Sequence, residues 1–379
     1  MTILFAGAIG RLPVGGHAWV QMQYLAGLAA LGHEVYYLED CGPESWVYNW
    51  ETQQMETTLD YPAGYVRDCL APIGFGERWM YRAGRRSRGM PVEQLLEVCA
   101  RADLLIIWAV PLGQWRPEYD RPRRRAFIDV DPGFTQISLA NGDGELAGTT
   151  GRCEHLFTIA QRMGAPDCPI PDAGRRWHRT VSPVFLEEWP VAGGGDATHF
   201  TSVMQWRGFR DVVFNGVPYG QKDREFPKFI DLPRRVRQPF RIALTGAAPE
   251  NLTARGWDVV EGWAASRTPD SYRRFIQESR AEFGVAKHGY VLMRGGWFSD
   301  RTACYLACGR PALLEDTGLA DWLPVGEGVV TFRDLDGAVR GVEAVNGDYE
   351  RHRRGARRIA EEYFDTAKVL PKLLEIATG

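Results

Sequence analysis

Short apolar runs alternate with longer amphipathic stretches along the first half of the chain. A helix with apolar positions at a 3.6-residue period is predicted over about residues 18–31, directly after the first run. Runs that are apolar at nearly every position are typical of strands buried on both faces, and their alternation with helices predicts a parallel sheet. We therefore expect a Rossmann-like first domain. Its strand runs are TILFAGAIG, HEVYYLED, ADLLIIWAV, RRAFIDVDPG and HLFTIAQRMG.

The same alternation resumes after a break between residues 184 and 201. The break contains a proline and three consecutive glycines and has no periodicity, which is typical of a crossover between domains. A chain of 379 residues also exceeds what one hydrophobic core usually organises. We predict an α/β fold of two Rossmann-like domains that face a cleft, with boundaries at 1–190 and 200–360. We expect a final helix at 361–379 to pack back on the first domain.

Seven tryptophans and tyrosines gather between residues 46 and 89, where the periodicity is weak. An insertion after the second strand lies at the carboxyl ends of the sheet, where ligands of such folds bind. Two interpretations stay open: an aromatic-lined acceptor pocket, or the ordinary packing of a long loop. The residues are Trp46, Tyr48, Trp50, Tyr61, Tyr65, Trp79 and Tyr81.

Composition narrows the class of partner and the compartment. The formal net charge of −3 argues against a nucleic acid or an anionic membrane as the main partner. The seven cysteines are odd in number and form no C-x2-C pair, which favours reduced thiols in a cytoplasmic protein. We expect no leader and no membrane span, because no run reaches about 18 apolar residues. The oligomeric state stays open, a homodimer included.

The stretch VGGHAWVQMQYLAGLAALGHEV, residues 14–35, places His17 between the first strand and its helix. An imidazole that titrates near neutral pH can take the proton of a hydroxyl as that hydroxyl attacks. The neighbouring glycines would let a substrate approach the backbone closely. The same position also suits a histidine that caps or packs at the helix start. His33, in the second GH, lies at the entry to a strand, and we expect it to be structural.

Two Rossmann-like halves facing one cleft are the architecture of GT-B glycosyltransferases, and this stretch resembles the start of their inverting, nucleotide-sugar-dependent members. In that family GH leads into the first helix and GHEV opens the second strand. The resemblance implies that His17 is the general base. The family often steadies the base with an aspartate after a later strand, where ADLLIIWAVPLGQW has tryptophan and proline. Asp131, in FIDVDPGFTQ beside Asp129, is our candidate; a turn role for DPG is the alternative.

A second window, KHGYVLMRGGWFSDRTACYLACGRPALLEDTG, resembles the donor-binding segment of the same family. There H-x-G-W-x-S precedes a helix and a G-x-P strand follows. Superposing the G-W-x-S elements assigns Gly296, Trp297 and Ser299 to donor binding and puts Arg294 where the family's histidine meets the pyrophosphate. Helix amides bind diphosphate, and a cation beside them neutralises charge as the nucleotide leaves. Ser299 also suits a helix N-cap.

The window departs from the family at the glutamate that grips the ribose, which falls on Cys304. Asp300 is the nearest acid, although a first-turn aspartate is also favourable helix electrostatics. After the next strand, Asp316 and Thr317 stand where family members contact sugar hydroxyls. The resemblance also implies donor contacts for two lysines outside the G-W-x-S element.

These two lysines would meet the diphosphate from different strands of the second domain. Lys222, in NGVPYGQKDREFPKF, follows the first strand of that domain, and a surface lysine is the alternative. Lys287 ends the run EFGVAK and would point toward the cleft if that run is a parallel strand. Glu282 would then be a structural partner.

The absence of two glutamates favours an inverting mechanism over a retaining one. Retaining GT-B enzymes carry a glutamate pair spaced E-x7-E, and both positions are non-acidic here, Gly296 and Cys304. The near match to a metal-binding D-x-D motif that ends a predicted strand is DVD at 129–131. We therefore predict an inverting, metal-independent glycosyltransferase without a cofactor. Its donor would be a nucleoside diphosphate sugar, of UDP or TDP, and its acceptor a hydroxyl of a small, natural-product-like molecule.

Two alternatives stay open. A sugar-nucleotide epimerase would use the same fold but would need paired carboxylates in the cleft. A non-catalytic sugar-nucleotide-binding partner protein would explain the missing ribose glutamate. An oxidoreductase is disfavoured, because GAIGRLPVGG lacks the G-x-G-x-x-G spacing.

Overall fold

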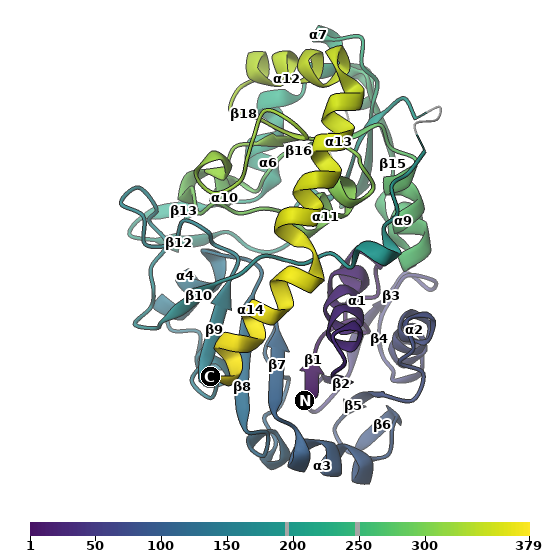
Figure 1. The fold of residues 1–379 in the computed structure, drawn as a ribbon, viewed down its shortest axis with the longest axis vertical. Coiled ribbons are helices and arrows are strands. Elements are labelled where there is room, and N and C mark those ends of the chain that lie inside the picture. Colours follow the sequence, from purple (N-terminus) through teal and green to yellow (C-terminus); the bar gives the residue numbers. More distant parts are fainter. Residues whose placement is uncertain (194–196, 247–250) are drawn as a thin grey trace.

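The computed structural model describes residues 1–193, 197–246 and 251–379. Within these residues the chain forms two α/β domains, one above the other, and a C-terminal helical segment runs along both (Figure 1). The three-glycine break of the sequence falls partly on residues 194–196, which lie outside the described residues.

An eight-stranded sheet forms the centre of the first domain. All neighbouring strands are parallel except the last pair, and the strands between the two edge strands are buried along most of their length, as their near-continuous apolar runs predict. In spatial order the strands are β10 (Trp177–Arg179), β9 (His155–Thr158), β8 (Arg124–Asp129), β7 (Leu104–Trp108), β1 (Thr2–Ala6), β2 (Glu34–Asp40), β5 (Trp79–Ala83) and β6 (Arg86–Gly89). The helices are α1 (Gly15–Ala30), α2 (Asp60–Leu70), α3 (Val92–Arg101), α4 (Phe134–Ala140) and α5 (Gly144–Thr150).

A six-stranded parallel sheet forms the centre of the second domain. Its order is β15 (Trp257–Glu261), β14 (Phe240–Thr245), β11 (Phe200–Gln205), β16 (Ala281–Gly284), β17 (Ala312–Glu315) and β18 (Val329–Phe332). The helices are α6 (Lys222–Glu225), α7 (Leu232–Arg235), α8 (Gly262–Ser266), α9 (Pro269–Gln277), α10 (His288–Met293), α11 (Asp300–Ala307), α12 (Leu335–Gly347) and α13 (Tyr349–Ile359). A hairpin of β12 (Val212–Phe214) and β13 (Val217–Tyr219) follows β11.

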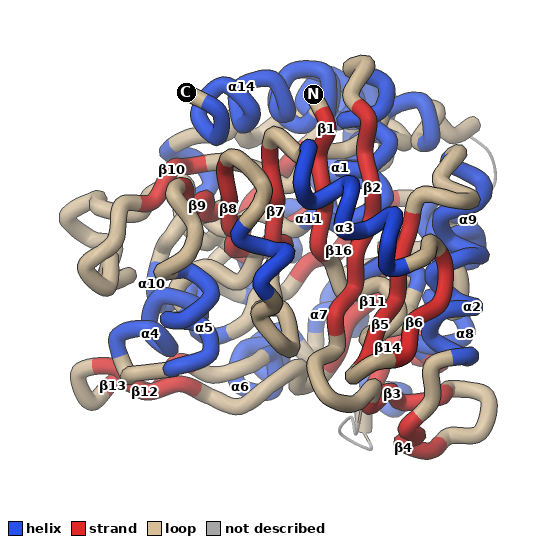
Figure 2. The backbone as a smooth tube through the Cα atoms, turned by 90° about the horizontal axis from the view of Figure 1, so that it is seen from below, coloured by secondary structure: helices blue, strands red, loops and turns tan. Residues whose placement is uncertain are grey.

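The strand order of each sheet reverses at one point, which is where ligands of doubly wound folds bind. In the first sheet β1 lies between β2 and β7, so the reversal falls between β1 and β7 (Figure 2). In the second sheet it falls between β11 and β16. The turns that leave β1, β7 and β16 are therefore the places to look for a site.

Glycines at the start of α1 let the two domains meet closely. Gly15 faces the carbonyl oxygen of Thr268 so closely that a β-carbon would have no room. The amide of Gly16 donates to Ser266 Oγ (3.1 Å), and Trp19 Nε1 donates to the carbonyl of Pro269 (2.7 Å). The first turns of α1 are thus fixed against the α8–α9 corner.

The end of the chain returns to the first domain. A π-helical turn, Ala360–Phe364, joins α13 to α14 (Thr366–Thr378), which lies on α1. Close contact is allowed by Gly27, where a β-carbon would meet Thr366 and Leu370. The crossover near residue 184 pairs with this segment, because Val184 donates to Phe364 O (2.7 Å) and accepts from the Thr366 amide (3.1 Å).

The aromatic segment 46–89 is not one loop. It begins with a hairpin of β3 (Trp46–Asn49) and β4 (Gln54–Thr57), continues into α2, and ends in β5 and β6, which extend the first sheet. Trp79 and Tyr81 are buried core residues of β5, whereas Trp46 is exposed. Only the middle of the segment, including Tyr61 and Tyr65, lines a cavity.

Candidate functional site

The turn after β1 is closed by side chains of the protein itself. The amides of Gly10 and Arg11 both donate to the carboxylate of Glu39 (2.8 and 2.6 Å), which is fully buried. The Ile9 amide donates to Tyr37 Oη (2.8 Å). Burial raises the pKa of Glu39 to about 7. Successive backbone amides of this kind bind anions, and here the anion is an internal carboxylate.

His17 is part of the first turn of α1 and lies over the end of β7. Its Nε2 is 3.0 Å from the carbonyl oxygen of Ala8, so Nε2 carries the proton and Nδ1 is left to accept one. The ring meets the Trp108 ring edge to face at 5.3 Å. Burial lowers the pKa of His17 to about 4, while the carboxylate of Asp131 acts to raise it. At neutral pH the imidazole is therefore uncharged.

The two aspartates of DVDPG have different surroundings. Asp129 is fully buried and accepts from Thr135 (2.6 Å), Gln136 (2.8 Å) and Thr158 (2.6 Å), so it holds the turn after β8 together. Asp129 therefore does not face the cleft, because its oxygens are used inside the first domain. Asp131 turns the other way, toward the second domain.

Asp131 makes the central contact between the domains. Lys287 Nζ donates to Asp131 Oδ1 at 2.8 Å, and the hydroxyl of Tyr290 donates to the same oxygen at 2.5 Å. Burial opposes ionisation, but the charge and hydrogen bond of Lys287 hold the pKa of Asp131 below its usual value. Lys287 therefore pairs with Asp131, and Glu282, which we had expected as its partner, instead accepts from Arg301 Nε (2.7 Å).

Aromatic rings pack against the Lys287 side of this ion pair. Lys287 Nζ lies 3.9 Å from the centre of the Phe209 ring, and the Tyr290 ring stacks on Trp297 with centres 4.2 Å apart. Cations over aromatic faces are stabilised, although the pair stays open to solvent on the Asp131 side, whose side chain is 42% exposed. Trp297, from the G-W-x-S element, thus supports the cross-domain contact through Tyr290.

Arg294 stands in a strained backbone position between the domains. It ends α10 in the left-handed conformation (φ 45°), where glycine is the usual residue. Its Nε donates to Asp167 of the first domain (3.2 Å), and Asp316 lies 3.9 Å from its guanidinium. A non-glycine residue kept in such a conformation points to a function for its side chain.

The loop from Gly296 to α11 forms the edge of the cleft. Gly296 has φ 71° and its amide donates to Thr317 O (2.8 Å). Ser299 occupies the N-cap position of α11, as expected, but its hydroxyl makes no capping hydrogen bond. Asp300 follows in the first turn. Burial raises the pKa of its carboxyl, with Arg301 acting against the rise.

The remaining sequence candidates have structural contacts in this structure. Lys222 is buried and donates to the carbonyl of Val285, and burial lowers its pKa to about 7. Asp316 accepts from Arg333 (2.8 Å) and from the amide of Gly318 (2.8 Å). Thr317 donates to Trp297 O (2.6 Å). Direct donor contact by these three residues stays a prediction.

Sequence reasoning missed three residues of this site. Glu39 is visible as an acid inside the buried run HEVYYLED, which is a signal that it has internal partners. The sequence around Tyr290 and Trp108 contains no motif that marks them, because their roles come from contacts with Asp131 and His17 in distant segments.

Neither a cluster of metal ligands nor a membrane-spanning helix is found among the residues that the structure describes. Among residues 1–193, 197–246 and 251–379, no three histidine, cysteine, aspartate or glutamate side chains gather as metal ligands would. No described helix combines the length and apolarity that a bilayer crossing requires. All seven cysteines are free thiols.

This pair of sheets, with its cross-domain contact, is the GT-B arrangement, and comparisons with known proteins agree. Residues 224–370 match the family model described as glycosyl transferase-like. An alpha-glucosyltransferase in complex with UDP matches with a TM-score of 0.61 at 10% identity, over 100% of this chain and 99% of that one. Anabaena HepE, in complex with UDP and glucose, matches with a TM-score of 0.61 at 10% identity, over 99% of each chain.

A sucrose-phosphate synthase from Thermosynechococcus elongatus matches with a TM-score of 0.53 at 12% identity, over 99% of this chain and 98% of that one. No curated protein sequence matches the chain. The chain thus has the two-domain GT-B fold of these solved structures, and its residues 224–370 resemble the glycosyl transferase-like family; the expected fold of two Rossmann-like domains is confirmed.

Proposed function

We propose that this protein is an inverting glycosyltransferase that moves a sugar from a uridine diphosphate sugar to a hydroxyl group. One observation carries the proposal. His17 of the first domain and the turns of the second domain that bear Lys287 and Arg294 converge at the carboxyl ends of both sheets, joined by the Asp131–Lys287 pair. The solved relatives that contain UDP or UDP-glucose support the donor class.

The donor diphosphate would lie at the start of α11. There the loop from Gly296 leads into a helix whose N-cap hydroxyl makes no bond to the helix, so its first turn lacks a side-chain cap. Arg294 supplies a cation at the near edge, and the helix dipole adds favourable potential for an anion. When the sugar is transferred, these groups would stabilise the charge that develops on the leaving nucleoside diphosphate.

His17 would act on the acceptor. With Nε2 held by the carbonyl of Ala8, Nδ1 can take the acceptor's proton while the acceptor oxygen attacks the anomeric carbon. The bond from that carbon to the diphosphate oxygen breaks in the same displacement, so the configuration inverts. Asp131 would favour the imidazolium that forms, through its negative charge.

The surroundings of two positions support inversion over retention. Where a retaining enzyme carries its first glutamate, Gly296 has a left-handed backbone, and a β-carbon would crowd Trp322 and Arg162. Where the second glutamate would stand, Cys304 is buried, and Gln23 of α1 donates to its sulfur at 3.6 Å. Neither position can offer a carboxylate to a sugar.

We further propose metal-independent transfer to a small-molecule acceptor. Arg294 and the helix amides would take the role that a divalent ion has in D-x-D enzymes. The DVD motif offers only Asp131 to the cleft, because Asp129 is used internally.

The test is the configuration of the product. The enzyme is incubated with UDP-α-glucose and a panel of phenolic and aliphatic alcohols in EDTA, and the anomeric proton of the product is read by NMR. We expect a β-glycoside and free UDP. An α-glycoside would contradict inversion, a need for divalent ions would contradict metal independence, and an epimerised donor without transfer would favour the epimerase.

A further inference from the structure

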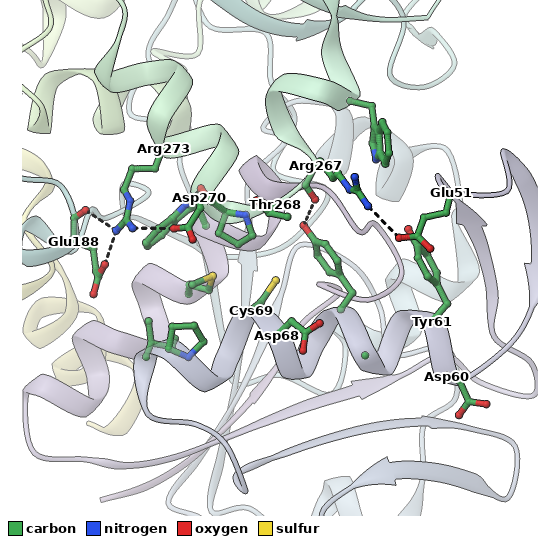
Figure 3. A pocket seen from close by; sticks show the side chains of 18 residues that line it. Glu51, Asp60, Tyr61, Asp68, Cys69, Glu188, Arg267, Thr268, Asp270 and Arg273 are labelled. Atoms are coloured by element: carbon green, nitrogen blue, oxygen red, sulfur yellow. Dashed lines mark hydrogen bonds and ion pairs between the residues drawn. The ribbon is translucent and has the colours of Figure 1, made fainter.

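A second cavity lies between the domains, away from the cleft just described. Its volume is about 670 Å³, within the range of small-molecule sites. The first domain contributes α2, the α1 residues Trp19 and Met22, and Glu51; the second contributes the α8–α9 corner. Figure 3 shows α2 below and α9 above the open space.

Helix α1 separates this cavity from His17. At 3.6 residues per turn, Trp19 and Met22 lie about 200° and 140° around the helix from His17. The contacts agree with that geometry. The His17 ring faces Ala8 and Trp108, whereas Trp19 faces Pro269 and Trp189. A ligand in the cavity therefore has no direct path to the proposed base, and the cavity is a separate site.

Flat aromatic rings form much of the wall. Tyr61 and Tyr65 come from α2, Trp19 comes from α1, and Trp263 comes from α8. Trp263 is itself held by Trp50, which stacks on it at 6.1 Å. Such rings offer faces for a ligand that has a flat apolar side, and their polar edges can still hydrogen-bond.

Five carboxylates and two guanidiniums surround these rings, and each carboxylate already has an arginine partner. Arg267 pairs with Glu51 (3.2 Å), and Arg273 pairs with both Glu188 (2.7 Å) and Asp270 (2.9 Å), as Figure 3 shows. The other two pairs are Asp60 with Arg88 (2.9 Å) and Asp68 with Arg67 (2.8 Å).

This pattern of charges selects against charged ligands. A cation would have to compete with an arginine at every carboxylate of the rim, with Glu188 and Asp270 sharing Arg273. An anion would meet a lining with five acids and two arginines. A neutral polyhydroxyl ligand can instead donate to a carboxylate and accept from its arginine at once, without breaking the pair. The aromatic walls and the paired charges together favour a ligand whose rings have one apolar face and are edged by hydroxyl groups.

We propose that this cavity binds a neutral oligosaccharide, outside the transfer cleft. The saccharide would touch both domains, because α2 and the α8–α9 corner form opposite walls. Only a few contacts close the gap between those walls, among them the bond from Tyr65 Oη to Arg267 O (3.2 Å). The proposal does not rest on the donor site or on His17.

Gly64 offers a direct test, because it lines the cavity and a β-carbon there would meet nothing within 4 Å. Gly64→Phe would fill the space and remove no contact, and phenylalanine suits a helix interior better than glycine. Gly148→Phe is the matched control: that glycine also lies in a helix with open space around it and is absent from the cavity lining.

Binding is measured by saturation-transfer NMR with maltotriose, cellotriose, chitotriose and mannotriose, on the wild type and on Gly64→Phe, Gly148→Phe, Trp263→Ala and His17→Ala. We expect at least one trisaccharide to bind. Gly64→Phe and Trp263→Ala should weaken it about tenfold or more, and the other two variants should leave it unchanged.

The proposal is overturned if none of the four sugars binds, or if binding survives Gly64→Phe but is lost in His17→Ala, which would place the sugar in the transfer cleft. Circular dichroism of each variant separates misfolding from loss of the site. UDP binding is measured separately and reports on the donor site. Its outcome is independent of whether the cavity binds a trisaccharide.

Discussion

The two turns that lead into helices α1 and α11 at the cleft differ in what occupies their backbone amides. In the first domain the turn after β1 encloses the carboxylate of Glu39, which accepts from the amides of Gly10 and Arg11. In the second domain the turn before α11 begins with Ser299, whose hydroxyl makes no capping bond, and Arg294 lies nearby. The first turn is closed to an outside anion, and the second is where we propose that one binds.

This difference separates the proposed tasks of the domains. A turn that is filled by its own carboxylate cannot hold a phosphate, so its remaining role is to fix the start of α1 and with it His17. The second turn keeps a costly left-handed arginine, which is consistent with a role in binding. Variants at the first turn should therefore affect the transfer step, and variants at the second turn should affect donor binding.

The largest effect is expected from His17→Ala. Removal of a general base typically costs about 10²- to 10⁴-fold in rate. We expect kcat to fall in that range while the Kd for UDP stays the same, because His17 belongs to the acceptor side. Steady-state kinetics and nucleotide binding measure the two quantities. His33→Ala, the other histidine of a GH pair, is the control and should retain full activity; equal losses would contradict the assignment.

The pH dependence of transfer should report the low pKa of His17. The base must be neutral, so kcat/KM rises with pH through the pKa of the free enzyme, and the acid limb should lie near pH 4. The charge of Asp131 raises that pKa, so Asp131→Asn should move the limb to lower pH by up to about one unit. The exposed Asp172→Asn should leave the limb in place. A limb near pH 6.5 in the wild type would argue against His17 as the base.

A smaller effect on stability should come from Glu39. Its pKa is about 7 in the fold and 4.5 ordinarily, so between these values the folded protein holds a proton that the unfolded chain releases. The stabilisation is complete below pH 4.5 and is lost as the pH rises through 7. Glu39→Gln cannot titrate. The Tm of the wild type relative to this variant should therefore fall between pH 5 and pH 8, and a constant difference would show that Glu39 is not the titrating group.

Much of the fold was predictable because its signals are local. Apolar runs and helical periods mark the strands and helices of both sheets. The pattern failed for β5 and β6, whose short runs lie within the aromatic segment, and for the β12–β13 hairpin, which lacks a buried alternating face. In these elements tertiary contacts decide the structure, so periodicity alone could not find them.

The site was less predictable, because its contacts join distant segments. The residues Asp131 and Lys287 were chosen separately, and nothing in the sequence indicates that they bond across 156 positions. The same holds for the Ala8 carbonyl that orients His17. The resemblance located both turns, but the roles of individual donor contacts stay predictions.

The most direct test of the account is calorimetry of UDP binding in EDTA, with the wild type and with Arg294→Ala, His17→Ala and the exposed Arg354→Ala. Because hydrogen bonds to charged groups contribute about 1.5–3 kcal/mol, Arg294→Ala should weaken binding about 10- to 100-fold. His17→Ala and Arg354→Ala should bind UDP as the wild type does. Undiminished binding by Arg294→Ala, or its loss in His17→Ala, would contradict a donor site built on the second domain.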